Sequence, residues 1–222
     1  MNINWYGQTC FRVTTQKRKN GPSNVLFDPF IEKGTGLRSP KIDAEIIMVS
    51  NPEKEISMGS NKKESPFLIS EPGEYDVREA YIKGIQAYTK NKIPKTDDGY
   101  ERTVIYTMEA EDMKVCHLGR IGQKELTPDQ LERIGEVDIL LIPVGGGESL
   151  EAAEASKIMS QIEPKVIIPM YYNFPKLKVK LDDLKGFLKV LGIKSVETLP
   201  KLSIKKKDLP EDDEAKIVAL TV

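Results

Sequence analysis

The chain has few of the side chains from which proteins build transition-metal sites. Its 222 residues include one histidine, His117, and two cysteines, Cys10 and Cys116. Zinc is bound through imidazole, thiolate and carboxylate groups, and imidazole is the commonest metal ligand. A single imidazole excludes a two-metal hydrolytic centre of the histidine-rich kind.

Long apolar runs and an excess of charge of either sign are also missing. No apolar stretch approaches the ~20 residues that span a bilayer, and the start of the chain lacks the pattern of a signal peptide. The 33 Lys and Arg nearly cancel the 34 Asp and Glu, which leaves a formal charge of -1. The charge therefore gives no reason to expect a nucleic acid or a membrane as partner. Two widely separated cysteines in strand-like segments indicate reduced thiols, so we expect a cytoplasmic protein.

What the sequence does contain is a series of short apolar runs typical of β-strands, separated by turn residues. These runs are Asn2–Tyr6, Cys10–Thr15, Asn24–Phe27, Glu45–Ser50, Pro66–Ser70, Glu74–Tyr88, Thr103–Glu109, Met113–Leu118 and Lys216–Val222. Two further runs, Val137–Val144 and Lys165–Met170, are apolar enough for central strands that are buried on both faces.

Helix signals lie mainly in the second half of the chain. A capping box over Thr127–Gln130, with proline at the first helical position, predicts a short helix that ends at Gly135. A second helix is expected over Ser149–Ile162 with a serine cap, and a third over Asp182–Leu191. Strand hairpins that lead into alternating strands and helices favour one layered α/β domain over residues 1–222, with helices outside the sheets.

Two polar stretches, Asn51–Ser65 and Lys90–Glu101, have little to bury and are expected to be loops. Either stretch is a rim or lid over a site, or a solvated connection between strands.

Seven segments, taken in order, resemble the metallo-β-lactamase fold, and most closely its branch of Zn-dependent hydrolases. The segments are Trp5–Phe11, Val25–Phe30, Val49-Ser50, Ile69–Val77, Cys116–Gly119, Leu141–Gly146 and Pro164–Met170. This resemblance spans nearly the whole chain. It implies a metallo-β-lactamase-like αββα four-layer sandwich with a zinc centre.

In that family a His-x-His-x-Asp-His motif follows the buried strand that ends here at Val49-Ser50. The matching positions in this chain include Asn51, Glu53 and Glu55, and none of them is a histidine. Two interpretations stay open for the glutamates. They ligate a hard cation such as Mg²⁺ or Ca²⁺, helped by Asp28, or they form a polar loop that is paired with neighbouring cations.

The later ligand positions of the family are changed as well. By the resemblance they fall on Thr89, Arg120 and Tyr171, where the family has histidine, aspartate and histidine. A guanidinium has no lone pair for a metal, and its charge repels a cation. We therefore expect Arg120 to neutralise Glu53 or Glu55 in the space that a metal would fill. Zinc is the family's cofactor, but the expectation for this chain is no metal and no other cofactor.

The histidine and its neighbour allow two interpretations. His117 matches a position that is not a ligand in the family, so a structural role is expected. A Cys116–His117 nucleophilic pair is disfavoured, because adjacent strand residues face opposite sides of a sheet. Gly145–Gly147 either cradles a phosphate on backbone amides or turns a strand into a helix.

The leading hypothesis is that the chain is a non-catalytic member of the family that has lost the metal centre. We therefore favour a protein that is not an enzyme. It would bind a small polar ligand or a protein partner, with a homodimer possible, and neither nucleic acid nor membrane. The expected residues around its vestigial cleft are Asp28, Asn51, Glu53, Glu55, Thr89, Arg120 and Tyr171. One alternative is a hydrolase of phosphoester, lactone or amide bonds that uses a carboxylate-ligated metal. A third is an RNA-processing relative, against which the near-neutral charge argues.

Overall fold

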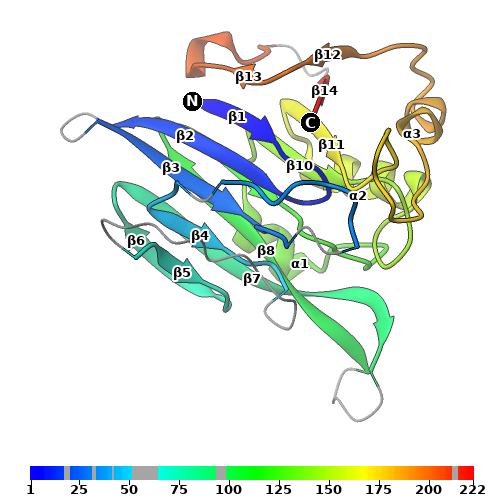
Figure 1. The fold of residues 1–222 in the computed structure, drawn as a ribbon, viewed down its shortest axis with the longest axis horizontal. Helices are drawn as coiled ribbons and strands as arrows, with labels where there is room; N and C mark the ends of the chain where they lie inside the picture. Colours follow the sequence, from blue (N-terminus) through cyan, green and yellow to red (C-terminus); the bar gives the residue numbers. More distant parts are fainter. Residues whose placement is uncertain (18–20, 32–33, 42, 52–64, 94–98, 212–214) are drawn as a thin grey trace.

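The computed structural model describes residues 1–17, 21–31, 34–41, 43–51, 65–93, 99–211 and 215–222. Two β-sheets pack face to face, with helices on the outer side of the larger sheet (Figure 1). One apolar core takes residues from both sheets and fills the space between them. The expected metallo-β-lactamase-like α/β fold is confirmed.

The smaller sheet has six strands in the order β13-β1-β2-β3-β4-β5. Its strands are β1 (Asn2–Trp5), β2 (Phe11–Lys17), β3 (Gly21–Phe27), β4 (Ile46–Met48), β5 (Phe67–Ile69) and β13 (Leu202–Ser203). Strands β3, β4 and β5 run parallel, while β1 pairs antiparallel with β2 and β13. The carboxyl ends of the three parallel strands therefore lie at one edge.

The larger sheet has eight strands in the order β12-β14-β11-β10-β9-β8-β7-β6. They are β6 (Gly73–Val77), β7 (Ala80–Lys92), β8 (Tyr100–Ala110), β9 (Met113–His117), β10 (Ile139–Pro143), β11 (Val166–Met170), β12 (Glu197–Leu199) and β14 (Lys216–Leu220). Antiparallel hairpins link β6 to β9, whereas β9, β10, β11, β14 and β12 run parallel.

Three α-helices and one short 3₁₀ turn occur among the described residues. They are α1 (Pro128–Ile134), α2 (Ala152–Ile162), α3 (Leu184–Val190) and η1 (Lys206–Asp208). Helix α1 packs on β7, and α2 packs on β10 and α3. None of the helices in the described part of the chain is long and apolar enough to cross a membrane.

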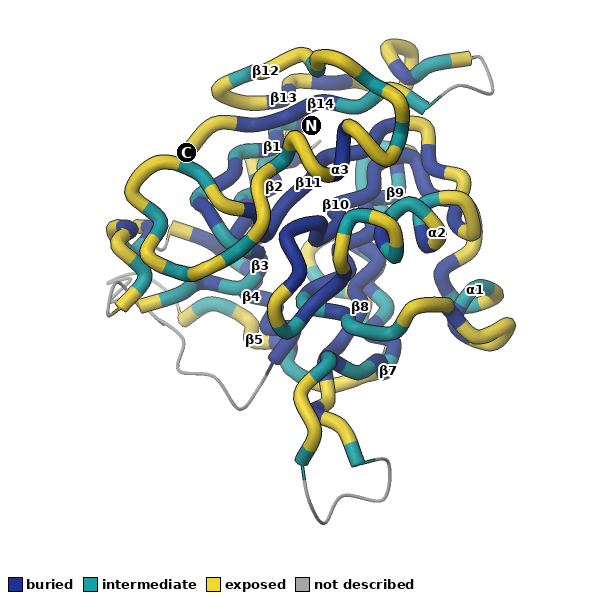
Figure 2. The backbone as a smooth tube through the Cα atoms, turned by 90° about the vertical axis from the view of Figure 1, so that its right-hand side faces the viewer, coloured by how far each residue is buried: buried dark blue, intermediate teal, exposed yellow. Residues whose placement is uncertain are grey.

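The alternating pattern of the strands separates two apolar faces of the smaller sheet. Val25 and Phe27 of β3 point into the main core, while Leu26 belongs to a smaller cluster on the opposite face. Ala44 and the partly buried Phe30 cover that outer cluster, so irregular chain packs there. Figure 2 shows the buried backbone concentrated in the strands and the exposed backbone in the connections.

Some elements differ from their expected bounds. The run Glu74–Tyr88 is two strands, β6 and β7, joined by a tight turn at Arg78 and Glu79 with φ of 51° and 64°. Neither residue is glycine or asparagine, so no turn signal was present. Strands β7 and β8 extend into the expected loop Lys90–Glu101, and β12 and β13 had no strand prediction.

Helix α2 begins at Ala152, later than the serine cap predicted. The Ser149 hydroxyl instead donates a 2.7 Å hydrogen bond to the Ile121 carbonyl, and Glu151 is the N-cap. The Glu151 amide donates to the Glu154 carboxylate at 2.9 Å. The serine was therefore wrongly assigned as a cap because a tertiary partner holds its hydroxyl.

The capping box at the start of α1 forms as the sequence predicts. The Thr127 hydroxyl accepts from the Gln130 amide at 3.2 Å, and the Gln130 side chain accepts from the Thr127 amide at 3.0 Å. We expect Thr127→Ala to lower the free energy of unfolding by about 1 kcal/mol, and the melting temperature by about 2–4 °C. Thr127→Ser, which keeps the acceptor, should change little. Calorimetry showing equal melting temperatures for all three proteins would contradict this.

Candidate functional site

Five polar side chains follow parallel strands and meet at one edge of the sandwich. They come from the ends of β3, β4, β9, β10 and β11 and are Asp28, Asn51, Arg120, Glu148 and Tyr171. Because the carboxyl ends of parallel strands share one edge, residues far apart in sequence converge there. This edge is the candidate site.

A hollow of about 390 Å³ opens at this edge. One part of its wall is polar and one part is apolar. Its lining residues are Gln8, Thr9, Asp28, Pro29, Phe30, Ile31, Thr35, Val49, Asn51, Arg120, Glu148, Tyr171 and Val179. A volume of this size suits a small molecule.

The centre of the polar wall is an ion pair between the Arg120 Nη1 and the Glu148 Oε1. The two side chains are only 13% and 17% exposed, and the Tyr171 hydroxyl donates to the same carboxylate oxygen at 3.1 Å. Burial acts to lower the pKa of Arg120, but Glu148 and then Asp28 outweigh it, so the net shift is upward. Burial and the nearby Glu148 raise the pKa of Tyr171. At neutral pH the hollow therefore contains a fixed cation and a neutral phenol.

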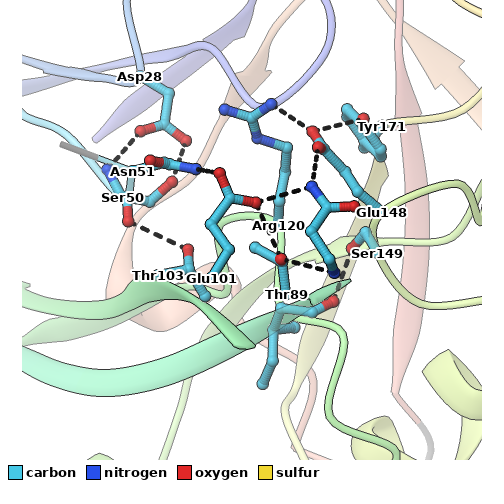
Figure 3. A network of polar contacts seen from close by, with 12 residues as sticks. Asp28, Ser50, Asn51, Thr89, Glu101, Thr103, Arg120, Glu148, Ser149 and Tyr171 are labelled. Atoms are coloured by element: carbon cyan, nitrogen blue, oxygen red, sulfur yellow. Dashed lines mark hydrogen bonds and ion pairs between the residues drawn. The ribbon is translucent and has the colours of Figure 1, made fainter. Parts of the chain in front are cut away.

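Behind the ion pair, a second carboxylate organises the floor of the site (Figure 3). Glu101 is 8% exposed and accepts from the Asn51 amide at 2.8 Å and from the Thr89 hydroxyl at 3.0 Å. The Asn91 side-chain amide donates to Glu101 at 2.8 Å and to Glu148 at 2.9 Å. One amide thus couples the two carboxylates, and β7 and β8 are tied to the turn after β10.

Asp28 is held by the end of the neighbouring strand. Its two carboxylate oxygens accept from the Ser50 amide at 2.6 Å and from the Ser50 hydroxyl at 2.7 Å (Figure 3). The Ser50 carbonyl in turn accepts from the Thr103 hydroxyl at 3.1 Å, which links the two sheets. The arrangement fixes the Asp28 carboxylate at the wall of the hollow.

Three of the nine non-glycine residues with positive φ in the described part of the chain line this hollow. Gln8, Asp28 and Tyr171 have φ of 50°, 45° and 52°, and all three line it. A side chain in the left-handed region costs energy unless its surroundings hold it, and such residues gather at functional sites. The Tyr171 amide donates to the Gln8 carbonyl at 3.1 Å, and a Cβ on Gly145 would lie 2.4 Å from the Tyr171 carbonyl oxygen. Close backbone packing therefore holds the strained residues.

Two buried donors in the hollow have no acceptor among the described residues. They are the Arg120 Nε and the Gln8 Nε2. Buried N–H groups are nearly always hydrogen-bonded, to protein, to water or to a ligand. Both residues line the hollow, while the two nitrogen atoms themselves are buried.

The structural role expected for His117 is confirmed. Its ring is fully buried, its Nε2 lies 2.8 Å from the Thr9 carbonyl oxygen, and its Nδ1 accepts from the Gly119 amide at 3.1 Å. These partners define a neutral imidazole that stacks on Phe27 at 4.8 Å. Burial raises the pKa of the Cys116 thiol to about 12, so the thiol stays protonated. These groups do not form an activated nucleophile.

The glycine run is a strand-to-helix turn. The Gly145 amide donates to the Tyr171 carbonyl at 3.1 Å, and the Gly146 amide donates to the Leu150 carbonyl at 2.8 Å. Because these amides are engaged, the structure supports the turn and not the phosphate cradle.

The structure brings together four of the seven sequence-predicted residues, Asp28, Asn51, Arg120 and Tyr171. Thr89 does not line the hollow and reaches the site through Glu101 and Asn91. Glu53 and Glu55 lie outside the described residues, and so does any pairing of Arg120 with them.

Three residues of the site were missed by the sequence analysis. Glu148, the described partner of Arg120, directly precedes the expected helix Ser149–Ile162 and was given no role in the site, although its place after a central strand was a usable signal. Glu101 was assigned to a loop, and Gln8 to a turn between strands. Nothing in the residue pattern pointed to these two.

The chain belongs to the β-lactamase superfamily, because the family model described as "Beta-lactamase superfamily domain" matches residues 2–171. A crystal structure from Thermotoga maritima, described as a Zn-dependent hydrolase of the metallo-β-lactamase superfamily, is 31% identical with a TM-score of 0.76, and each chain is covered completely. A UPF0173 metal-dependent hydrolase of Methanocaldococcus jannaschii is 23% identical over 222 residues, covering 90% of this chain and 97% of the relative. A UPF0173 protein of Pyrococcus abyssi is 28% identical over 196 residues, or 78% and 84% of the two chains.

These comparisons correct one expectation from the sequence. We expected no cofactor, whereas the names of the relatives describe metal-dependent or Zn-dependent hydrolases and imply a metal cofactor in the family. The prediction of no cofactor is therefore contradicted.

The described side chains at the hollow do not by themselves fit a metal pair. Over the part of the chain that the structure describes, no three His, Cys, Asp or Glu residues gather in a metal-binding arrangement. The group at the middle of the hollow is the Arg120 guanidinium, which offers five N–H donors and no lone pair. His117 has both ring nitrogens engaged elsewhere.

The ion pair in the hollow should be important for stability. Arg120→Gln leaves the Glu148 carboxylate without its cation near Glu101, so we expect the free energy of unfolding to fall by about 2–3 kcal/mol. The double variant Arg120→Gln/Glu148→Gln should lose less than the sum of the two single changes. Glu197→Gln, which removes an exposed pair with Lys216, is the control and should cost under about 0.5 kcal/mol. Strictly additive single changes in urea unfolding would contradict the pairing.

His117 should make stability depend on pH. Burial lowers its pKa below the ordinary 6.5, although Asp28 and the hydrogen bond to Thr9 act in the opposite direction. The unfolded chain therefore takes up a proton near pH 6.5 that the folded chain does not bind until lower pH, so stability falls as the pH falls. We expect a loss of up to about 1.4 kcal/mol per pH unit below about pH 6.5, absent in His117→Gln. Identical pH profiles for the two proteins would refute this.

Proposed function

We propose that this chain is a ligand-binding, non-catalytic member of the superfamily, and that the hollow around Arg120 is its ligand site. The observation that carries the proposal is the pair of buried donors without an acceptor, the Arg120 Nε and the Gln8 Nε2. Both belong to the lining of one hollow. A ligand that presents acceptor oxygens there would satisfy them.

The charges of the hollow favour a neutral ligand over an anion. Arg120 and Glu148 neutralise one another, and Asp28 adds a negative charge to the wall. A strongly anionic ligand would meet that carboxylate at short range. A carbonyl oxygen of an amide or a lactone accepts hydrogen bonds without bringing a net charge.

The apolar residues of the lining favour an apolar group on the same ligand. They are aliphatic, aromatic and proline side chains, namely Pro29, Phe30, Ile31, Val49 and Val179. Apolar contact stabilises a complex by roughly 25 cal/mol for each Å² removed from water. The geometry therefore supports a small amphipathic molecule with a carbonyl-type head.

The titratable groups of the site already have hydrogen-bond partners within the protein, which favours ligand binding over catalysis. The Asp28 carboxylate is engaged by Ser50, the Glu148 carboxylate by Arg120 and Tyr171, and the His117 ring by its backbone partners. A general base needs a lone pair directed at the substrate. The His117 ring has no lone pair left for a substrate, and both carboxylates already accept hydrogen bonds from the protein.

A second candidate is metal-dependent hydrolysis of a phosphoester, lactone or amide bond. The names of the UPF0173 relatives and the description of the Thermotoga maritima protein favour it. In this chain it would draw on carboxylates near Asp28, including Glu53 and Glu55, which lie outside the described residues.

One probe distinguishes the two candidates. An N-hexanoyl amino lactone carries an amide, a lactone and an apolar chain, so calorimetry reports its binding and mass spectrometry reports its ring opening. We expect binding without turnover, with or without added zinc. Gln8→Gly, which removes a donor at a position with positive φ, should weaken binding about tenfold, or about 1.4 kcal/mol.

Gln16→Leu, on an exposed strand position outside the hollow, is the matched control and should bind like the parent chain. Ring opening or amide cleavage that is lost in Asp28→Asn would instead establish the hydrolase. If the parent chain and Gln8→Gly bind the lactone equally well, the Gln8 side-chain amide does not donate to the ligand, and the proposal is wrong.

A further inference from the structure

A second cavity lies beside the sandwich and shares no lining residue with the hollow. Its volume is about 970 Å³, and we call it the aromatic groove. Its walls are residues 36–41, residues 172–176 and the end of β14. None of these segments lines the hollow.

Three aromatic rings form the floor of the aromatic groove. The ring centroid of Trp5 lies 5.0 Å from that of Tyr172 and 5.1 Å from that of Phe174. The indole Nε1 donates to the Gln8 carbonyl at 2.9 Å, so the polar atom of Trp5 is satisfied within the protein. Trp5 and Tyr172 are only 4% and 6% exposed, so a ligand in the groove meets apolar surface mainly at the half-buried Phe174 and at Val222, which is 59% exposed.

The rim of the aromatic groove is cationic. Arg38, Lys41 and Lys176 line it, and no Asp or Glu side chain does. Within the described residues, none of these three cations has an ion-pair partner. Even with the terminal carboxylate of Val222 counted, the rim keeps an excess of positive charge. This contrasts with a chain whose formal net charge is -1.

We propose that the aromatic groove binds a soluble amphipathic anion, with an acyl or aryl chain against Trp5, Tyr172 and Phe174 and a carboxylate or phosphate head at the cationic rim. Both halves of the ligand follow from the lining. Apolar surface that is exposed next to uncompensated cations is costly in water unless a molecule of matching polarity covers it. A small-molecule cavity that combines an apolar lining with a few charged groups also matches the usual anatomy of a ligand site.

Binding in the groove can be measured by the fluorescence of Trp5. It is the only tryptophan in the chain, so its fluorescence reports on the floor of the groove without a label. The probe is laurate, kept below its critical micelle concentration. We expect a saturable change in Trp5 fluorescence with laurate, and at least tenfold weaker binding of dodecyltrimethylammonium, which has the same chain length and the opposite charge.

Charge variants test the head-group assignment. The triple variant Arg38→Gln/Lys41→Gln/Lys176→Gln should bind laurate at least tenfold more weakly. The matched control is Lys201→Gln/Lys205→Gln/Lys207→Gln, which removes three exposed cations that do not line the groove and should leave binding unchanged. Thr198→Phe, which adds bulk to the wall, should also weaken binding without a change of charge.

Four results would overturn the proposal. These are the absence of a saturable signal with laurate, equal binding of the cationic amphiphile, an equal loss of binding in the control triple variant, and binding only to phosphatidylglycerol vesicles and not to free laurate. Circular dichroism of each variant confirms that a loss of binding is not a loss of folding. Because the groove and the hollow have separate linings, Arg120→Gln should leave laurate binding intact.

Discussion

The ion pair between Arg120 and Glu148 determines what the edge of this sandwich can do. A charge that is largely removed from water needs a partner of opposite sign close by, because the interior screens charges poorly. Glu148 supplies that partner from the turn after β10, and Tyr171 and Asn91 complete the hydrogen bonds of its carboxylate. The Arg120 Nε is buried and has no hydrogen-bond acceptor among the described residues. The electrostatic balance of this edge thus depends on one ion pair.

The arrangement of parallel strands explains why the pair forms there. Strands of both sheets end at the same edge, and the chain leaves each strand with a polar residue. At Gln8, Asp28 and Tyr171 the backbone adopts positive φ, which is unfavourable for these residues and persists because close packing holds it. The relatives described as metal-dependent hydrolases belong to the same superfamily. In this chain the edge contains a guanidinium, a phenol and amides together with the carboxylates of Asp28 and Glu148.

The strands and helices were largely predictable from local patterns, and the partners across the site were not. Apolar runs predicted the central strands, and the Thr127 capping box predicted α1, because both signals depend only on neighbours in sequence. The turn at Arg78 and Glu79 carried no such signal. Glu148 directly precedes an expected helix, whereas its role comes from Arg120, which lies on a different strand end. Contacts set by topology need the fold before they can be identified.

The most direct measurement of the central claim is a crystal structure determined from crystals grown with zinc, with anomalous scattering recorded at the zinc edge. We expect continuous electron density between the Arg120 guanidinium and the Glu148 carboxylate, with the Gln8 side-chain amide at the wall of the hollow. It would be contradicted by an anomalous peak in the hollow with Asp28 and Glu148 turned toward the ion and Arg120 displaced to solvent.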